Sequence, residues 1–90
     1  MLDVSGNILD DEAIRAICDS LIMSHNLTLQ KFKLNDTGCG QYGITTIIET
    51  MRCIHKICTV EVENCKNVSP DSMAKLNTAL RINQAREEKY

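Results

Sequence analysis

Aromatic side chains are scarce in this chain of 90 residues, which has no tryptophan and a single phenylalanine. Its core therefore has to be aliphatic, built from isoleucine, leucine, valine, methionine and cysteine. No apolar run approaches the roughly 20 residues needed to span a bilayer, so we expect no membrane partner. The opening stretch, MLDVSGNILDDE, lacks both the basic start and the apolar run of a signal peptide.

An excess of charge of one sign is also missing, since 10 basic and 12 acidic residues are intermixed along the chain. Nucleic-acid surfaces need clustered lysine and arginine, so no nucleic-acid partner is expected. The five cysteines are an odd number without a secretion signal. They indicate reduced, mostly buried thiols in an intracellular, cytoplasmic protein. At this length the chain makes at most one small domain.

One pattern of apolar residues occurs three times, at offsets of 30 and 28 residues. We call the three segments units: the first spans about 1–26, the second about 27–54 and the third about 55–90. The second unit shows the pattern most fully, at Leu29, Phe32, Leu34, Thr37, Cys39 and Gly43. The first unit supplies Leu2, Val4, Asn7 and Leu9, and the third supplies Ile57, Val60, Val62 and Cys65.

Each unit predicts a short strand, a tight turn and a helix. Apolar residues alternate in the strands and recur at helical spacing afterwards, which predicts helices over about 12–24 and 42–54. Asp10 is placed to cap the first helix, and the sequence SPD at 69–71 starts the third. From Asn83 the polar tail predicts a frayed end or a solvated last turn. The buried stripe of the third helix is predicted at Met73, Leu76, Leu80 and Ile82.

One such unit cannot bury its apolar face alone, whereas stacked units bury a continuous core. We therefore predict an α/β solenoid of about three units, with a short parallel sheet on one side and helices on the other. It forms one domain over residues 1–90. The first unit starts in the middle of the pattern, and no polar segment precedes it. Because terminal repeats need a polar outer face, we expect a C-terminal piece of a longer solenoid, with further repeats or another chain covering the first strand.

The units resemble leucine-rich repeats of the ribonuclease-inhibitor type, whose frame L-x-x-L-x-L-x-x-N/C-x-L is followed by a helix often preceded by glycine. The resemblance implies a sheet on the concave side of the solenoid and helices on the convex side. Thr37 departs from the frame, and its hydroxyl is expected to bond the turn less completely than asparagine would. The third unit lacks the helix-opening glycine, which fits a C-terminal cap.

The resemblance also implies a non-enzymatic scaffold that binds a protein partner through the outward side chains of the strands. These side chains, which we call the outer strand face, are Asp3, Ser5, Lys31, Lys33, Asn35, Thr59, Glu61 and Glu63. Lysines of the second unit stand there beside glutamates of the third, and each cross-strand pair of opposite charge contributes about 0.2–1 kcal/mol. Similar repeats occur in actin pointed-end regulators, cytosolic immune receptors and ciliary scaffolds, so the resemblance allows cytoskeletal or ciliary partners and a cytoskeletal location. The alternative is a purely structural capping role.

A rival interpretation starts from GCGQYG at 38–43, a literal G-x-G-x-x-G motif between a predicted strand and a predicted helix. Glu61 or Glu63 would then be the ribose-binding acid of a small nucleotide-binding α/β domain. The first glycine of such a fingerprint directly follows its strand, whereas Gly38 comes four residues after Leu34. The repeat pattern also accounts for these glycines without a ligand.

Soft metal ligands occur at Cys53, His55, Cys58 and Cys65, but the paired spacing of structural zinc sites is absent. We therefore predict no metal and no cofactor. His25 and His55 fall at equivalent helix ends, where a solvated or helix-capping role is expected. No serine–histidine–aspartate order indicates a nucleophile, and Cys–His catalysis would need a cleft that a thin solenoid lacks.

Overall fold

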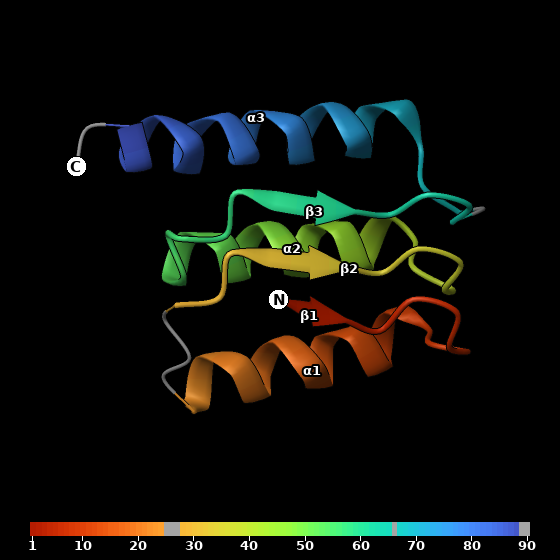
Figure 1. The fold of residues 1–90 in the computed structure, drawn as a ribbon. Coiled ribbons are helices and arrows are strands. Elements are labelled where there is room, and N and C mark those ends of the chain that lie inside the picture. The colour runs from red at the N-terminus through yellow and green to blue at the C-terminus, as the bar shows by residue number, and fades with distance from the viewer. Residues whose placement is uncertain (25–27, 66, 89–90) are drawn as a thin grey trace.

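Strands and helices alternate along the chain in the computed structural model, which describes residues 1–24, 28–65 and 67–88 (Figure 1). The strands are β1 (Leu2–Asp3), β2 (Lys31–Lys33) and β3 (Thr59–Glu61), and the helices are α1 (Asp11–Met23), α2 (Gln41–Cys53) and α3 (Pro70–Glu88). The strands form one parallel sheet in the order β1-β2-β3. Helix α2 lies behind this sheet and packs against both α1 and α3. The predicted α/β class with a short parallel sheet is confirmed.

The strand register follows the offsets of the sequence pattern. Phe32 of β2 lies beside Leu2 of β1 and beside Val60 of β3. The ladder continues past the strands, because the Val4 N–H donates to the Lys33 carbonyl at 2.9 Å and the Leu34 N–H donates to the Glu61 carbonyl at 2.8 Å. The predicted alignment of the three units at 30 and 28 residues is therefore confirmed in the sheet.

All three strands leave the sheet through a residue in the left-handed backbone region. These residues are Gly6 with φ 78°, Asp36 with φ 56° and Asn64 with φ 60°. Glycine, asparagine and aspartate tolerate this conformation better than other residues. The Asn64 side-chain amide donates to the Asp36 carboxylate at 2.9 Å, so neighbouring turns are also linked to each other.

Thr37 bonds its turn more completely than we expected of a threonine in place of asparagine. Its hydroxyl donates to the Leu34 carbonyl at 2.8 Å, accepts from the Cys39 N–H at 3.3 Å and lies 3.6 Å from the Cys65 sulfur. The equivalent Asn7 donates to the Val4 carbonyl at 2.8 Å. Threonine therefore closes its own turn and touches the next unit as well.

The core is aliphatic, as predicted, with Phe32 as its one aromatic side chain among the described residues. Its fully buried members include Ile14, Leu34, Ile44, Ile47, Ile54, Ile57 and Leu76. Cys18, Cys39 and Cys65 are buried thiols without disulfides, and burial raises the pKa of the Cys39 thiol to about 12. These cysteines pack as small hydrophobic side chains.

The predicted helix starts are confirmed, with the first two helices beginning one residue earlier than expected. Asp10 accepts a hydrogen bond from the Ala13 N–H at 2.8 Å, as an N-cap should. Ser69 accepts from the Ser72 N–H at 3.2 Å, and Pro70 opens α3. No helix in the described ranges is long and apolar enough to cross a membrane.

The prediction for the third helix is wrong at Ile82, which is 52 % exposed, and at Asn83, which is buried at 3 %. Helix α3 continues to Glu88, and residues 84–86 are exposed, as a solvated last turn requires. The Asn83 side-chain amide donates to the Met51 carbonyl at 3.2 Å and to the Ile57 carbonyl at 2.9 Å. Backbone acceptors at the end of α2 and in the loop to β3 thus select an amide where hydrophobic spacing predicts an apolar side chain.

Candidate functional site

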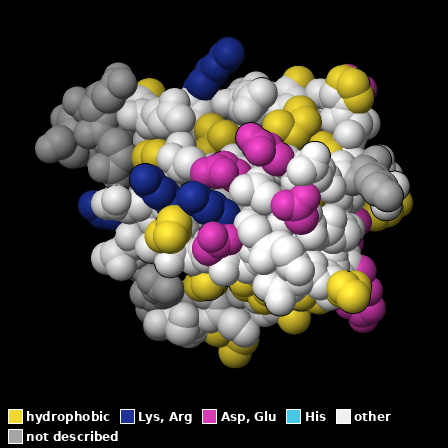
Figure 2. Space-filling model, turned by 45° about the vertical axis from the view of Figure 1, so that its right-hand side comes forward, with side chains coloured by type: hydrophobic (Ala, Val, Ile, Leu, Met, Phe, Trp, Pro, Cys, Tyr) yellow, Lys and Arg dark blue, Asp and Glu magenta, His cyan; other side chains and the backbone are white. Residues whose placement is uncertain are grey.

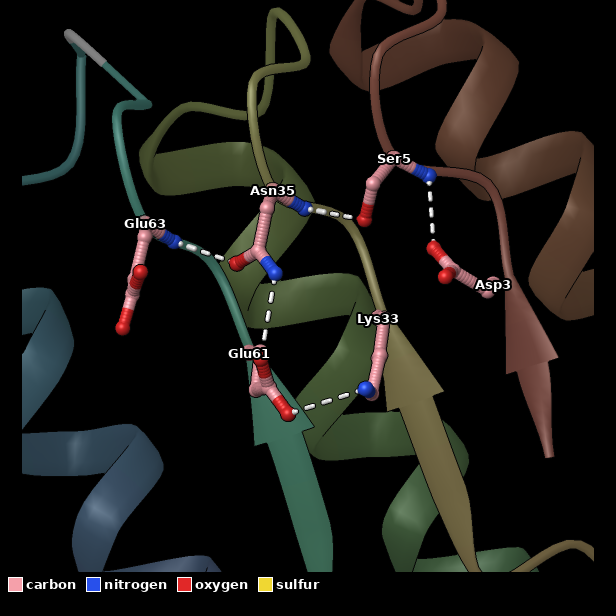
Figure 3. Close-up of polar contacts among 6 residues, drawn as sticks. All are labelled: Asp3, Ser5, Lys33, Asn35, Glu61 and Glu63. Atoms are coloured by element: carbon pink, nitrogen blue, oxygen red, sulfur yellow. Dashed lines mark hydrogen bonds and ion pairs between the residues drawn. The ribbon is translucent and has the colours of Figure 1, made fainter.

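The outer strand face lies along the three strands and the residues that follow them (Figure 3). Asp3, Lys31 and Glu63 are exposed, and the remaining five members are half-buried. Those five are Ser5, Lys33, Asn35, Thr59 and Glu61. The sequence therefore predicted side chains that reach solvent, but neighbours hold most of them in place.

Side-chain acceptors alternate with backbone carbonyls at the carboxyl ends of the strands, where the Gly6 N–H still donates to the Asn35 carbonyl and the Asp36 N–H to the Glu63 carbonyl, both at 2.8 Å. The Ser5 hydroxyl accepts from the Asn35 N–H at 2.9 Å, and the Asn35 side-chain oxygen accepts from the Glu63 N–H at 2.8 Å (Figure 3). These three residues hold equivalent positions in the three units. The outer strand face is therefore fixed by a hydrogen-bonded row that crosses all three strands, which limits the rearrangement that binding would require.

Glu61 is held from two sides on this row. The Lys33 ammonium lies 3.6 Å from one carboxylate oxygen of Glu61, and the Asn35 side-chain amide donates to the other at 3.1 Å. The predicted cross-strand pairing of lysine and glutamate is thus present for these two residues. Their side chains are 31 % and 37 % exposed, so the ion pair contributes at most about 1 kcal/mol and serves chiefly to orient Glu61.

Asp3 provides a hydrogen-bond acceptor at the end of the edge strand β1. Its carboxylate accepts from the Ser5 N–H at 3.0 Å, a group that in the next two strands bonds to the preceding unit. Hydrogen bonds from Ser5, and secondarily the charge of Lys33, hold the pKa of the Asp3 carboxyl below its usual value. Asp3 therefore keeps its negative charge on the outer strand face over the neutral pH range.

Two charges of opposite sign remain available on this face. Within the described residues, Lys31 and the Glu63 carboxylate take part in no ion pair. Figure 2 shows basic and acidic side chains gathered in adjacent groups on the surface of the molecule. The face can therefore form ion pairs and hydrogen bonds with a partner that carries both signs of charge.

The GCGQYG loop is already occupied by a group from the first unit. The Asp11 carboxylate accepts from the Gly40 N–H at 2.6 Å, at the start of α2. A Cβ on Gly43 would lie 2.7 Å from the same carboxylate, and a Cβ on Gly38 would lie 2.5 Å from the Leu9 carbonyl oxygen. Phosphates bind helix N-termini through such N–H groups. Because an internal carboxylate takes that place and close backbone approach explains the glycines, this geometry weighs against nucleotide binding.

The soft ligands near the end of α2 do not converge. Cys53 and His55 are exposed, Cys58 is half-buried, and Cys65 lies in the core, where its thiol donates to the Leu34 carbonyl at 3.3 Å. Within the part of the chain that the structure describes, no group of three or more histidine, cysteine, aspartate or glutamate side chains is arranged to hold a metal.

His55 caps a helix end. Its ring Nε2 lies 2.6 Å from the Arg52 carbonyl oxygen at the last turn of α2, so the predicted capping role is confirmed for this histidine. The equivalent His25 lies outside the described residues.

No protein-family model matches the chain, and neither a curated protein nor a solved structure matches it significantly.

Two sets of polar contacts were not predicted. Asp11 accepts from the Gly40 N–H at the start of α2, and the buried Asn83 donates to backbone carbonyls. Asp11 and Gly40 lie 29 residues apart, close to the period of the pattern, so an acid in one unit facing a glycine in the next was a usable signal. The helical spacing of Leu76 and Leu80 was a signal for the burial of Asn83, but its partners are backbone carbonyls and left no signal in the sequence.

Proposed function

We propose that the chain is a leucine-rich-repeat solenoid that acts as a non-enzymatic protein-binding scaffold, with its partner on the outer strand face. The observation that carries the proposal is the hydrogen-bonded row of Ser5, Asn35 and Glu63 at equivalent positions of three parallel strands. It supports both parts of the proposal, because the same link recurs between units and because it gives the face a fixed shape. Rigid faces bind with less loss of conformational entropy than mobile ones.

A protein fits this face better than a nucleic acid or a membrane does. Lys31 and Lys33 stand beside Glu61 and Glu63, so the face has no single sign of charge. Phosphate backbones and anionic bilayers would meet the two glutamates as repulsive groups. A folded partner or peptide can place an acid at Lys31 and a base at Glu63. Cytoskeletal or ciliary proteins of the cytoplasm are the candidates that the resemblance suggests.

A structural capping role is the alternative, and it is favoured by the apolar residues beside β1. Met1 is 74 % exposed and Ile8 is fully exposed. A further repeat or another chain that packed on β1 would cover both side chains. In that arrangement the present units finish a longer solenoid, and the partner-binding surface lies elsewhere.

A charge swap on the outer strand face separates the two roles. The double variant Lys31→Glu with Glu63→Lys keeps the net charge and breaks no ion pair among the described residues. Its control, Arg15→Glu with Asp19→Lys, swaps an exposed pair on α1. Affinity capture from cells that express the chain, quantified by mass spectrometry, should lose a partner with the first variant and keep it with the control. Equal recovery with both would refute the outer strand face and favour capping.

The solenoid itself is tested by lengthening it. A second copy of residues 29–56 inserted after Lys56 keeps the register, because Leu29 and Ile57 hold equivalent positions. Since solenoid stability is a sum over units and their interfaces, the longer chain should fold. Its urea m-value should rise by roughly a third, in proportion to the added residues.

The control for this experiment is a glycine–serine segment of equal length at the same point, which should add no cooperative structure. In a closed globular domain, both insertions should give the same urea midpoint and the same m-value. If the duplicated chain loses its helical circular dichroism, or unfolds with the midpoint and m-value of the control, the repeat architecture is wrong.

A further inference from the structure

A groove of about 470 Å³ lies between α2 and α3, apart from the outer strand face. Ile48 and Met51 of α2 and Ala79 and Ile82 of α3 form its apolar surface. Met51 is almost fully buried, whereas Ile82 is 52 % exposed. Contact of the exposed Ile82 with a further apolar surface is favourable, because it removes the apolar surface area of this side chain from water.

Three cations line the same groove. Arg52, Lys75 and Arg86 stand around the apolar surface together with one acid, Glu49. Within the described residues no ion pair holds any of the three cations. The chain as a whole has a net charge of −2, so the groove has the opposite sign to the rest of the molecule. Charge complementarity therefore calls for an acidic occupant.

The spacing of these residues fits a helix. Lys75, Ala79, Ile82 and Arg86 follow one another on α3 at helical spacing, over a length of about 16 Å at 1.5 Å per residue. Two neighbouring helices with an apolar seam accept the ridge of a third helix between them. An extended peptide gains its affinity from open strand edges, and the helices that form this groove offer none.

We propose that the groove binds an acidic amphipathic α-helix of about three turns from a partner protein. Its apolar stripe packs on Ile48, Ala79 and Ile82, and its aspartates or glutamates pair with Arg52, Lys75 and Arg86. This proposal does not depend on the outer strand face.

A bilayer or a nucleic acid fits the groove less well. The apolar surface is recessed as far as Met51, which a flat membrane would not reach. Single-stranded nucleic acids bind proteins by stacking bases on aromatic side chains, and the groove is lined by none.

The probe for the test is a fluorescein-labelled peptide of about 18 residues, with leucine at every third or fourth position and glutamate at most of the others. Anisotropy titration should show saturable binding that weakens as salt rises. The double variant Arg52→Glu with Arg86→Glu should weaken binding by about tenfold or more, and Ile82→Asp should do the same. Arg81→Glu is the control for Arg86→Glu alone, because each reverses one charge on α3 and Arg81 is exposed and does not line the groove; Arg81→Glu should leave the affinity within about twofold.

Several results would overturn the proposal. One is equal binding of a scrambled peptide of the same composition, which would indicate diffuse charge attraction. A loss of affinity with Arg81→Glu equal to the loss with the groove variants would indicate the same. Others are binding to phosphatidylserine vesicles with none to the peptide, or self-association of the chain that Ile82→Asp abolishes. The variant of the outer strand face, Lys31→Glu with Glu63→Lys, should bind the peptide with unchanged affinity. A failure of the groove proposal can therefore be distinguished from a failure of the proposed scaffold role. Circular dichroism confirms that each variant is folded.

Discussion

Replacement of Asn83 by alanine should cost this chain much of its stability. Asn83 is 3 % exposed, and its side-chain nitrogen donates to two backbone carbonyls, those of Met51 and Ile57. Alanine removes both hydrogen bonds and leaves both acceptors in a region that water reaches poorly. The loss cannot be attributed to helix propensity, because alanine is the better helix former.

The magnitude follows from those two acceptors. A hydrogen bond contributes about 1 kcal/mol net, and a buried acceptor left without a donor costs about 1–3 kcal/mol. The two effects overlap, so we expect about 2–4 kcal/mol in total for Asn83→Ala. A chain of this length has about 5–13 kcal/mol of stability. The melting temperature should therefore fall by about 10–25 °C.

Urea denaturation followed by circular dichroism measures this loss, and the next residue supplies the control. Gln84 donates to the Cys58 carbonyl at 2.9 Å but is exposed, so Gln84→Ala should cost less than about 1 kcal/mol. Asn83→Leu fills the space without restoring a donor and should stay strongly destabilised. If Asn83→Ala and Gln84→Ala cost the same, or if leucine restores full stability, the buried amide does not hold α3 in place.

Other substitutions test the contacts between the first and second units. Gly43→Ala places a Cβ 2.7 Å from the Asp11 carboxylate and 2.9 Å from the Cys39 sulfur; it should cost about 1–3 kcal/mol in urea denaturation. Asp11→Ala removes the acceptor of the Gly40 N–H at the start of α2 and should cost about 1–2 kcal/mol, with Glu12→Ala near zero as its control. Cysteine reactivity tests the core: a short iodoacetamide pulse should label the exposed Cys53 and spare Cys39, whose thiol is buried with its pKa raised to about 12. Rapid labelling of Cys39 in the folded chain would contradict this packing.

The register of the sheet was predictable because it depends only on the repeated spacing of apolar residues. Phe32 aligns with Leu2 and Val60 in the sequence, and the same three residues are neighbours in the sheet. The members of the outer strand face were predictable for the same reason, since alternate residues of a strand point to opposite sides. Which of them bond to each other was not predictable, because that depends on side-chain rotamers and on which backbone N–H groups take a side-chain acceptor.

The end of α3 shows where residue polarity misleads a prediction from helical spacing. The spacing of Leu76 and Leu80 continues to position 83, but the polarity of Asn83 favoured a solvated tail from that residue, with Ile82 inside in its place; the structure reverses the two. A prediction from residue polarity assigns polar side chains to water unless a partner is known, and the partners of Asn83 are backbone carbonyls, which leave no trace in the pattern of residue types. The contact of Asp11 with the start of α2 was missed for a different reason, because Asp11 belongs to another helix and local capping rules consider only nearby residues.

The contacts of the second and third units connect the stability experiment to both proposed binding surfaces. Asn35 links to Glu61 and Glu63 on the outer strand face, and Asn83 links α3 to the end of α2 beside the groove. Each surface is thus built from residues of both units and exists only while the two are packed together. A partner on either surface adds free energy to this packing and should raise the melting temperature according to its concentration and affinity. Loosening the packing through Asn83→Ala should weaken the groove for its helix more than it weakens the outer strand face, because Ile82 and Arg86 stand next to the lost contact, whereas the row from Ser5 to Glu63 has its own hydrogen bonds.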